Sequence, residues 1–202
     1  MSTLIVPVNA GDHIQGSNDA PATLVEYGDY KCPYCGEAFP IVKDLQKEMG
    51  GDLRFIFRNF PLTEIHRHAL AAAGAAEAAA LQDRFWEMHD MLYENQDKLR
   101  DRDLIARAQT LKLNIERFMS DLSSHEVITK IQEDFSGGIR SGVNGTPTFF
   151  INGLRHDGSY EYEDLLAALQ EQLEPQFESG LRPHAKHQKV HERKMSHANA
   201  NQ

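Results

Sequence analysis

Hydrophobic positions in the first sixty residues follow two different spacings. The segment Ala22–Gly28 is mostly apolar and is bounded by Pro21 and Gly28, which predicts a buried strand. Apolar residues then recur at helical spacing as far as Gly50, and Leu53–Phe57 alternates as a second strand. A strand, a helix and a strand in this order predict a βαβ unit with parallel strands and a right-handed crossover.

Helical spacing continues throughout residues 65–139. An alanine-rich stretch at residues 69–80 is a strong helix former, although Glu77 interrupts its apolar run. Further helices are predicted from the apolar groups that include Phe85, Leu104, Ile115 and Val127. So long a helical stretch inside a mixed pattern predicts an inserted helical domain.

Strand signals return near the end of the chain. Thr148–Ile151 reads as a strand, and Asn152-Gly153 predicts a hairpin to a short strand at residues 154–156. An amphipathic helix at residues 162–173 follows. We therefore expect an α/β domain built from residues 1–63 and 141–174, with residues 64–140 as the helical insert. Residues 1–21 are expected to be a mostly extended lead-in, and residues 175–202 a disordered polar tail.

Composition and charge exclude several classes of protein. The chain is 41% hydrophobic, and its formal net charge of −9 disfavours a general nucleic-acid binder. No run approaches the roughly 20 apolar residues of a membrane span. The first residues lack the basic and apolar regions of a signal peptide, so the expected location is cytoplasmic.

The chain has only two cysteines, Cys32 and Cys35, and they follow the first predicted strand. A bridge between them closes a very small loop, so a chemical role is favoured over a structural one. A sulfur at the start of a helix is stabilised as thiolate by the free N–H groups of the first turn. We expect Cys32 to be the more exposed attacking thiol and Cys35 a buried resolving thiol. Pro33 suits the first helical turn because it has no N–H group.

Two other interpretations of the cysteines remain open. A zinc site would need two more ligands, and the chain has no second cysteine pair. Only His187 and His191, in the predicted tail, have a suitable histidine spacing. The second alternative is a pair of inert cysteines on a helix, which their position between a strand and a helix disfavours. No metal and no cofactor is expected.

Four segments of the sequence form a recognisable set: Glu26–Cys35, Arg58–Pro61, Phe85–His89 and Gly142–Gly153. Together they resemble the DsbA-like branch of the thioredoxin superfamily. The resemblance extends over about residues 12–173. It implies a thioredoxin fold with an inserted all-helical domain and thiol–disulfide exchange.

The resemblance also implies roles for individual residues. Pro147 matches the family's cis-proline, and the backbone of Thr146 is expected to bind substrate in a strand-like manner. Glu26 matches a buried carboxylate that exchanges a proton with the resolving thiol, although it could also be a polar residue at a strand edge. Pro33 and Tyr34, between the cysteines, are expected to contact substrate.

The preferred hypothesis is a thiol–disulfide oxidoreductase that acts on protein or low-molecular-weight disulfides and is recycled by a redox partner. Nucleic-acid and membrane partners are not expected. A glutathione-dependent transferase or isomerase of the same fold is one alternative, against which Cys35 counts because such an enzyme needs no resolving thiol. A chaperone-like binding module with incidental cysteines is the other.

Overall fold

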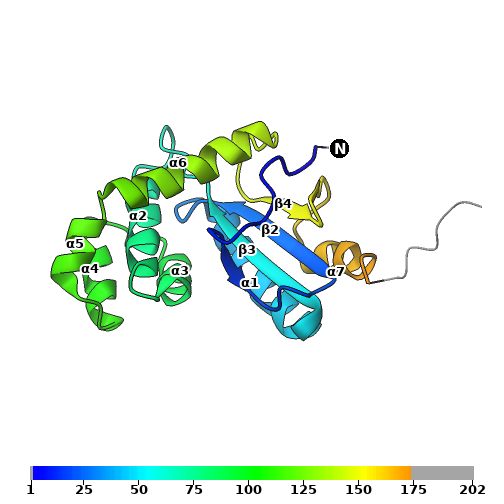
Figure 1. Ribbon diagram of the computed structural model, residues 1–202, viewed down its shortest axis with the longest axis horizontal. Helices are drawn as coiled ribbons and strands as arrows, with labels where there is room; N and C mark the ends of the chain where they lie inside the picture. Colours follow the sequence, from blue (N-terminus) through cyan, green and yellow to red (C-terminus); the bar gives the residue numbers. More distant parts are fainter. Residues whose placement is uncertain (1, 174–202) are drawn as a thin grey trace, which may run out of the picture.

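A five-stranded sheet forms the centre of the computed structural model, which describes residues 2–173 (Figure 1). Its strands lie in the order β1-β3-β2-β4-β5. Strands β2 and β3 are parallel, as the βαβ pattern predicts, and the other neighbours are antiparallel. The strands are β1 (His13–Gln15), β2 (Ala22–Gly28), β3 (Leu53–Asn59), β4 (Thr148–Ile151) and β5 (Leu154–Arg155).

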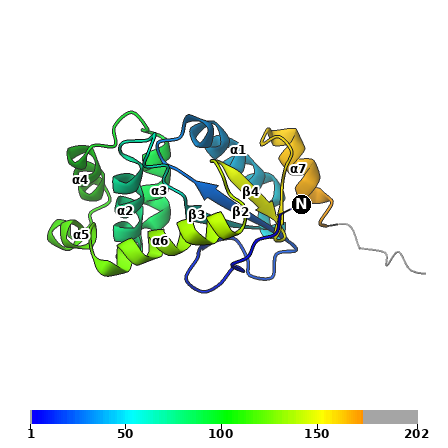
Figure 2. The same ribbon diagram turned by 90° about the horizontal axis from the view of Figure 1, so that it is seen from above.

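Helices cover both faces of this sheet. Helix α1 (Pro33–Met49), followed by the 3-10 turn η1 (Gly50–Asp52), packs with α7 (Tyr162–Gln170) on one face. Helix α6 (His125–Arg140) lies on the opposite face, as Figure 2 shows. Side chains alternate along β2, so successive residues pack into the cores on opposite faces of the sheet. Leu24 belongs to the core under α1, and Val25 and Tyr27 belong to the core with Phe135 of α6.

The insert lies between β3 and β4 in the chain and beside the sheet in space (Figure 1). Its helices are α2 (Ala69–Ala80), α3 (Phe85–Tyr93), α4 (Asp101–Thr110) and α5 (Ile115–Asp121), with α6 leading back to the sheet. Helix α2 is in the middle and packs against α3, α4, α5 and α6. The domain boundary expected at residue 140 coincides with the end of α6, whose second half packs on the sheet.

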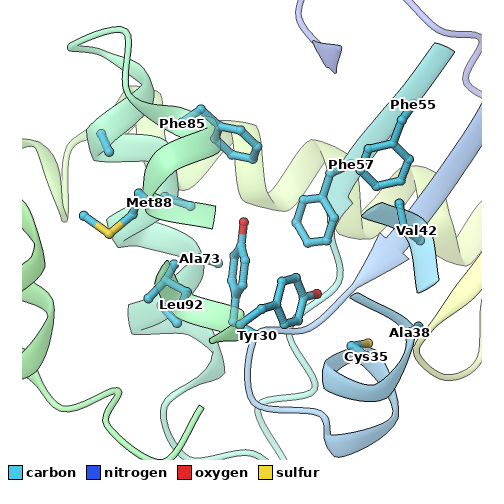
Figure 3. Close-up of a cluster of buried hydrophobic side chains, with 14 of the residues drawn as sticks. Tyr30, Cys35, Ala38, Val42, Phe55, Phe57, Ala73, Phe85, Met88 and Leu92 are labelled. Carbon is cyan, nitrogen blue, oxygen red and sulfur yellow. The ribbon is translucent and has the colours of Figure 1, made fainter. Parts of the chain in front are cut away.

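Aromatic side chains fill the space between the insert and the sheet. Figure 3 shows Phe57 of β3, Tyr30 and Phe85 in this space, with Cys35 and Ala38 on the neighbouring α1. The ring of Phe57 lies 5.2 Å from that of Tyr30 and 6.3 Å from that of Phe85, measured between centroids. The turn between β2 and α1, which carries Tyr30 and Cys32, is therefore packed against the insert as well as against the sheet.

The structure adds detail that the sequence pattern lacked. Strand β1 lies within the expected lead-in and pairs with β3, but it has only three half-buried residues and too little alternation to be recognised. Leu81 and Leu111 are the C-cap residues of α2 and α4. In residues 2–173, no helix is both long and apolar enough to cross a membrane. The predicted tail lies outside the described residues.

Candidate active site

Helix α1 begins at the cysteine pair. Cys32 is the N-cap residue, with φ −68° and ψ 123°, and Pro33 occupies the first turn. The N–H of Cys32 donates to the Asp29 carbonyl at 3.0 Å, which closes the turn between β2 and α1. Both cysteines are free thiols. Cys35 is fully buried, and Cys32 is only 3% exposed, so the expected difference in exposure is small.

The two sulfurs have opposite acid–base character. The pKa of Cys32 is lowered to about 5, mainly by a hydrogen bond from the Cys35 thiol, which outweighs the opposing effect of burial. Backbone N–H groups of Cys35 and Tyr34, in the first helical turn, add to this. Burial raises the pKa of Cys35 well above its usual value, and the hydrogen bond to Cys32 acts in the same direction. At neutral pH, Cys32 is therefore a thiolate and Cys35 a thiol.

The loop before β4 brings Thr146 and Pro147 to the cysteines. The Thr146–Pro147 peptide bond is cis. The thiol form of Cys32 donates from Sγ to the Thr146 carbonyl oxygen at 3.2 Å, across 114 positions of sequence. This proximity follows from the sheet, because Thr148 of β4 is paired with Tyr27 near the end of β2. The substrate-binding role of Thr146 and Pro147 stays a prediction.

Glu26 lies beneath the active site on β2. It is 2% exposed and sits between Phe57 of β3 and Phe149 of β4, so it belongs to the middle of the sheet and not to an edge. Burial, with a smaller contribution from the charge of Cys32, raises the pKa of Glu26 to about 8. Among residues 2–173, its Oε1 atom has no hydrogen-bond partner. Its proposed proton exchange with Cys35 stays a prediction.

The residues between the cysteines face outwards. Pro33 is exposed, and Tyr34 is 57% exposed, which makes both available to a substrate. Their contact with substrate stays a prediction. In the part of the chain that the structure describes, no three His, Cys, Asp or Glu side chains are grouped as metal ligands.

Asp29 lies in the turn between β2 and α1 and makes several contacts there. Its buried carboxylate accepts from the N–H groups of Lys31 (2.7 Å) and Leu62 (2.8 Å) and contacts Nδ1 of His66 (2.8 Å). Its own N–H donates to Sγ of Cys35 at 3.5 Å. Asp29 thus fixes the turn that carries both cysteines.

Gln96, in the loop after α3, is a site residue that sequence reasoning missed. Its side-chain Nε2 donates to the backbone carbonyls of Tyr30 (3.0 Å) and Cys32 (2.8 Å). Its backbone carbonyl accepts from Nζ of Lys31 at 3.0 Å. A side chain at Gly36 would collide with the Gln96 amide. The contact joins residues 64 positions apart, and no local pattern marks it. The insert therefore holds the active-site turn directly.

Comparison with known proteins places this geometry in a family. The family described as thioredoxin matches residues 8–171. The chain belongs to the thioredoxin family. BdbD from Bacillus subtilis has a TM-score of 0.74 at 26% identity, covering 85% of this chain and 98% of its own. A thioredoxin-like oxidoreductase from Silicibacter pomeroyi has a TM-score of 0.73 at 26% identity, covering 81% and 92%.

Within the thioredoxin family, this chain has the DsbA-like architecture. The Wolbachia pipientis thiol-disulfide exchange protein α-DsbA2 shares the fold, with a TM-score of 0.72 at 18% identity over 81% of this chain and 88% of its own. The predicted thioredoxin fold with a helical insert is confirmed. The chain therefore has a DsbA-like thioredoxin fold, and one of its solved neighbours is a thioredoxin-like oxidoreductase.

The curated relatives with higher sequence identity are named as Na(+)/H(+) antiporters. The Na(+)/H(+) antiporter NhaA 1 of Salinispora arenicola is 48% identical over 167 residues, which are 82% of this chain and 26% of the relative. NhaA 1 of Mycobacterium sp. (strain KMS) is 40% identical over 171 residues, or 83% and 28%. The chain spans about a quarter of the length of these relatives.

Proposed function

We propose that this chain is a thiol–disulfide oxidoreductase that exchanges disulfides with protein or low-molecular-weight substrates through Cys32 and Cys35. One observation carries the proposal: two thiols one helical turn apart have opposite pKa shifts. Because the thiolate is the attacking species, Cys32 is ready to react at neutral pH, while Cys35 stays protonated until the second step.

The reaction proceeds in two exchanges. The Cys32 thiolate attacks one sulfur of a substrate disulfide, and the other substrate sulfur leaves as thiolate and takes up a proton. Cys35 then loses its proton and attacks Sγ of Cys32, which breaks the mixed disulfide and releases the second substrate thiol. The substrate is reduced and the protein is left with a Cys32–Cys35 disulfide. A dithiol partner reverses these steps and recycles the enzyme.

Substrate is expected to lie along the loop before β4. The main chain of Thr146 stands beside the Cys32 sulfur, and an extended peptide placed there would pair with it as an added strand. Tyr34, between the two cysteines in the chain, is exposed and offers a contact surface.

The test uses single-cysteine variants in the reduction of an insulin disulfide. Cys32→Ser should abolish turnover, whereas Cys35→Ser should stop after the first step and accumulate mixed disulfides that dithiothreitol releases. Full activity of Cys32→Ser would overturn the proposal. Turnover of a glutathione conjugate by Cys35→Ser would favour the transferase alternative. Substrate binding that is unchanged in the double variant, without mixed disulfides, would favour a binding module.

The proposal includes a cytoplasmic setting. Genetically encoded probes place the glutathione pool there at about −280 to −320 mV, which is more reducing than the interval of about −270 to −120 mV expected for this pair, so the cysteines should be mostly reduced in growing cells. Rapid acid quenching and alkylation of the thiols would measure this ratio. A predominantly oxidised pair would contradict the cytoplasmic setting and leave the exchange chemistry intact.

A further inference from the structure

A tyrosine of the insert reaches the buried carboxyl of Glu26. Glu26 and Gly28, two residues apart on β2, face the same side of the sheet. A Cβ atom at Gly28 would lie 2.9 Å from Oε1 of Glu26 and 2.7 Å from the hydroxyl of Tyr93. Both oxygens therefore face one point beside the backbone of Gly28. Tyr93 is the last residue of α3, so its hydroxyl belongs to the insert.

Neither of these oxygens has a hydrogen-bond partner in residues 2–173, so each is available to the other. Buried polar atoms without partners are costly, and few occur in native proteins. Tyr93 is 6% exposed, and its ring is stacked on Phe39 with centroids 5.3 Å apart and packed against Tyr30 at 4.9 Å. Packing therefore holds the hydroxyl where it faces the carboxyl.

A tyrosine hydroxyl suits a carboxyl that changes its protonation state. It donates a hydrogen bond to an ionised carboxylate and accepts one from a protonated carboxyl. A phenylalanine of the same shape would do neither. On β3 and β4, the neighbours of Glu26 are Phe57 and Phe149, whose side chains offer it no hydrogen bond.

We infer that Tyr93 is a positioning residue whose hydroxyl donates to the Glu26 carboxylate once Glu26 is ionised and thereby controls proton exchange between Glu26 and Cys35. This inference rests on the proposed function, since the resolving step is where that proton moves. In the mixed disulfide, the Glu26 carboxylate takes the proton of Cys35. The resulting Cys35 thiolate attacks Sγ of Cys32, and the substrate thiolate leaves.

Other titratable groups face this site and define what the test must separate. The Tyr93 hydroxyl itself stays protonated in the working range, because burial raises its pKa well above the usual value. The groups around Glu26 and Tyr93 are Cys35 of α1, Cys32 at its N-cap, Asp29 and Tyr30 in the turn before it, and His89 of α3, whose ring lies 5.0 Å from that of Tyr93. The variants below leave all five unchanged unless stated.

The kinetic test is Tyr93→Phe, which removes only the hydroxyl. Loss of a hydrogen bond to the charged carboxylate should raise the pKa of Glu26 by about one unit. The pH midpoint of the resolving step should move up by the same amount, with about tenfold slower resolution at pH 7. Tyr27→Phe is the matched control, because its buried hydroxyl accepts from Arg58 on the opposite face of the sheet. This control should leave the midpoint unchanged.

A second measurement does not depend on activity. The ¹³C signal of the Glu26 carboxyl can be titrated in a Cys32→Ser, Cys35→Ser background, with Glu26→Gln identifying the resonance. Tyr93→Phe should raise the titration midpoint there too. Kinetically, it should have no further effect on the pH midpoint once Glu26→Gln is present.

Each result decides one question. An unshifted or lowered carboxyl midpoint in Tyr93→Phe overturns the role of Tyr93, even if the wild-type protein exchanges disulfides normally. A wild-type protein without exchange activity overturns the proposed function, while the carboxyl titration still decides whether Tyr93 donates to Glu26.

Discussion

Cys32 and Cys35 have the same side chain, and their different chemistry comes from a few contacts on one helical turn. Cys32 caps the helix and receives the hydrogen bond of its partner, while Cys35 lies in the core. The N–H of Asp29 donates to the inner sulfur, and Gln96 holds the carbonyl of Cys32. These groups act on the cysteines without being part of the motif between them.

The pKa of Cys32 predicts the reduction potential of the pair. Its value of about 5 lies between the roughly 7 of thioredoxin and the roughly 3.5 of DsbA. Because a stabilised thiolate favours the reduced form, we expect a potential between about −270 and about −120 mV. Titration in glutathione buffers, with alkylation to separate the two states, measures it. A potential outside this interval would mean that thiolate stabilisation at Cys32 does not control the pair.

Gln96→Glu should weaken the Cys32 thiolate. The substitution removes the donor to the Cys32 carbonyl and places a negative charge beside the Cys32 backbone, so the pKa of Cys32 should rise by about one unit. Thiolate absorbance at 240 nm against pH gives the value. Gln109→Glu, exposed on α4, carries the same charge change and should leave the pKa unchanged. Equal titration curves for the two variants would refute a direct action of Gln96.

Glu26→Gln should change how stability depends on pH. The pKa of Glu26 is about 8 in the folded protein against a usual value of 4.5. Its raised pKa therefore contributes stability that is complete below pH 4.5 and is lost as pH rises through 8. The glutamine variant lacks this loss, so its stability relative to wild type should increase between pH 5 and pH 9. Urea unfolding of the reduced proteins at both pH values tests this, and a constant difference would contradict it.

Local sequence and resemblance identified the residues that react, but not those that surround them. Cys32, Cys35 and Pro147 stand in short recognisable motifs, and Glu26 lies at a fixed distance before the first cysteine. Gln96 and Tyr93 approach from a different domain, and their contacts depend on how α3 packs against the sheet. Such contacts are set by tertiary structure, and no spacing along the chain encodes them.

At the scale of elements, α2 shows why its sequence is so rich in alanine. The helix packs against α3, α4, α5 and α6, and all its alanines except Ala71 and Ala80 are buried. Small side chains allow these helices to approach closely, and at Gly74 even a methyl group would lie 3.2 Å from the Leu122 carbonyl oxygen. The sequence predicts this helix from propensity, whereas its central position follows only from the packing.

Enlarging a buried alanine of α2 should destabilise the protein. Ala76 is fully buried, and Ala76→Leu should lower the free energy of unfolding by about 1–3 kcal/mol through overpacking. Leu70, on the same helix, is 52% exposed, and Leu70→Ala should change it by less than about 0.5 kcal/mol. Urea unfolding compares the two. Unchanged stability of Ala76→Leu would contradict this prediction and show that the packing around Ala76 accommodates the larger side chain.

At the scale of the whole molecule, buried polar side chains join the insert to the sheet. Glu77 of α2 accepts from Nδ2 of Asn59 at 2.6 Å and contacts Nε2 of His13 at 2.9 Å. Asp134 of α6 accepts from the N–H of Asn59 at 3.0 Å and pairs with Lys130. Asn59, at the end of β3, thus links two helices of the insert to the sheet.

Asn59→Ala should weaken this junction. It removes a donor from a buried carboxylate, so we expect a loss of about 2–3 kcal/mol in the free energy of unfolding. Asn18→Ala, on an exposed loop, is the control and should be nearly neutral. Unfolding followed by circular dichroism and by Trp86 fluorescence should coincide in wild type, because Trp86 packs against Phe55 of the sheet. Separate transitions in wild type would mean that the two domains unfold independently.

The position of the insert in the chain also has a consequence for biosynthesis. Cys32 and Thr146 meet in the active site but are 114 residues apart, with the whole insert between them. As a chain leaves the ribosome, β2, α1 and β3 emerge with both cysteines long before β4 is translated. A nascent chain therefore carries both cysteines without the loop of Thr146 and Pro147 while the whole insert is being made. Under the proposed function, the thiols gain their substrate-facing loop only when β4 docks, so the active site is completed only after the insert.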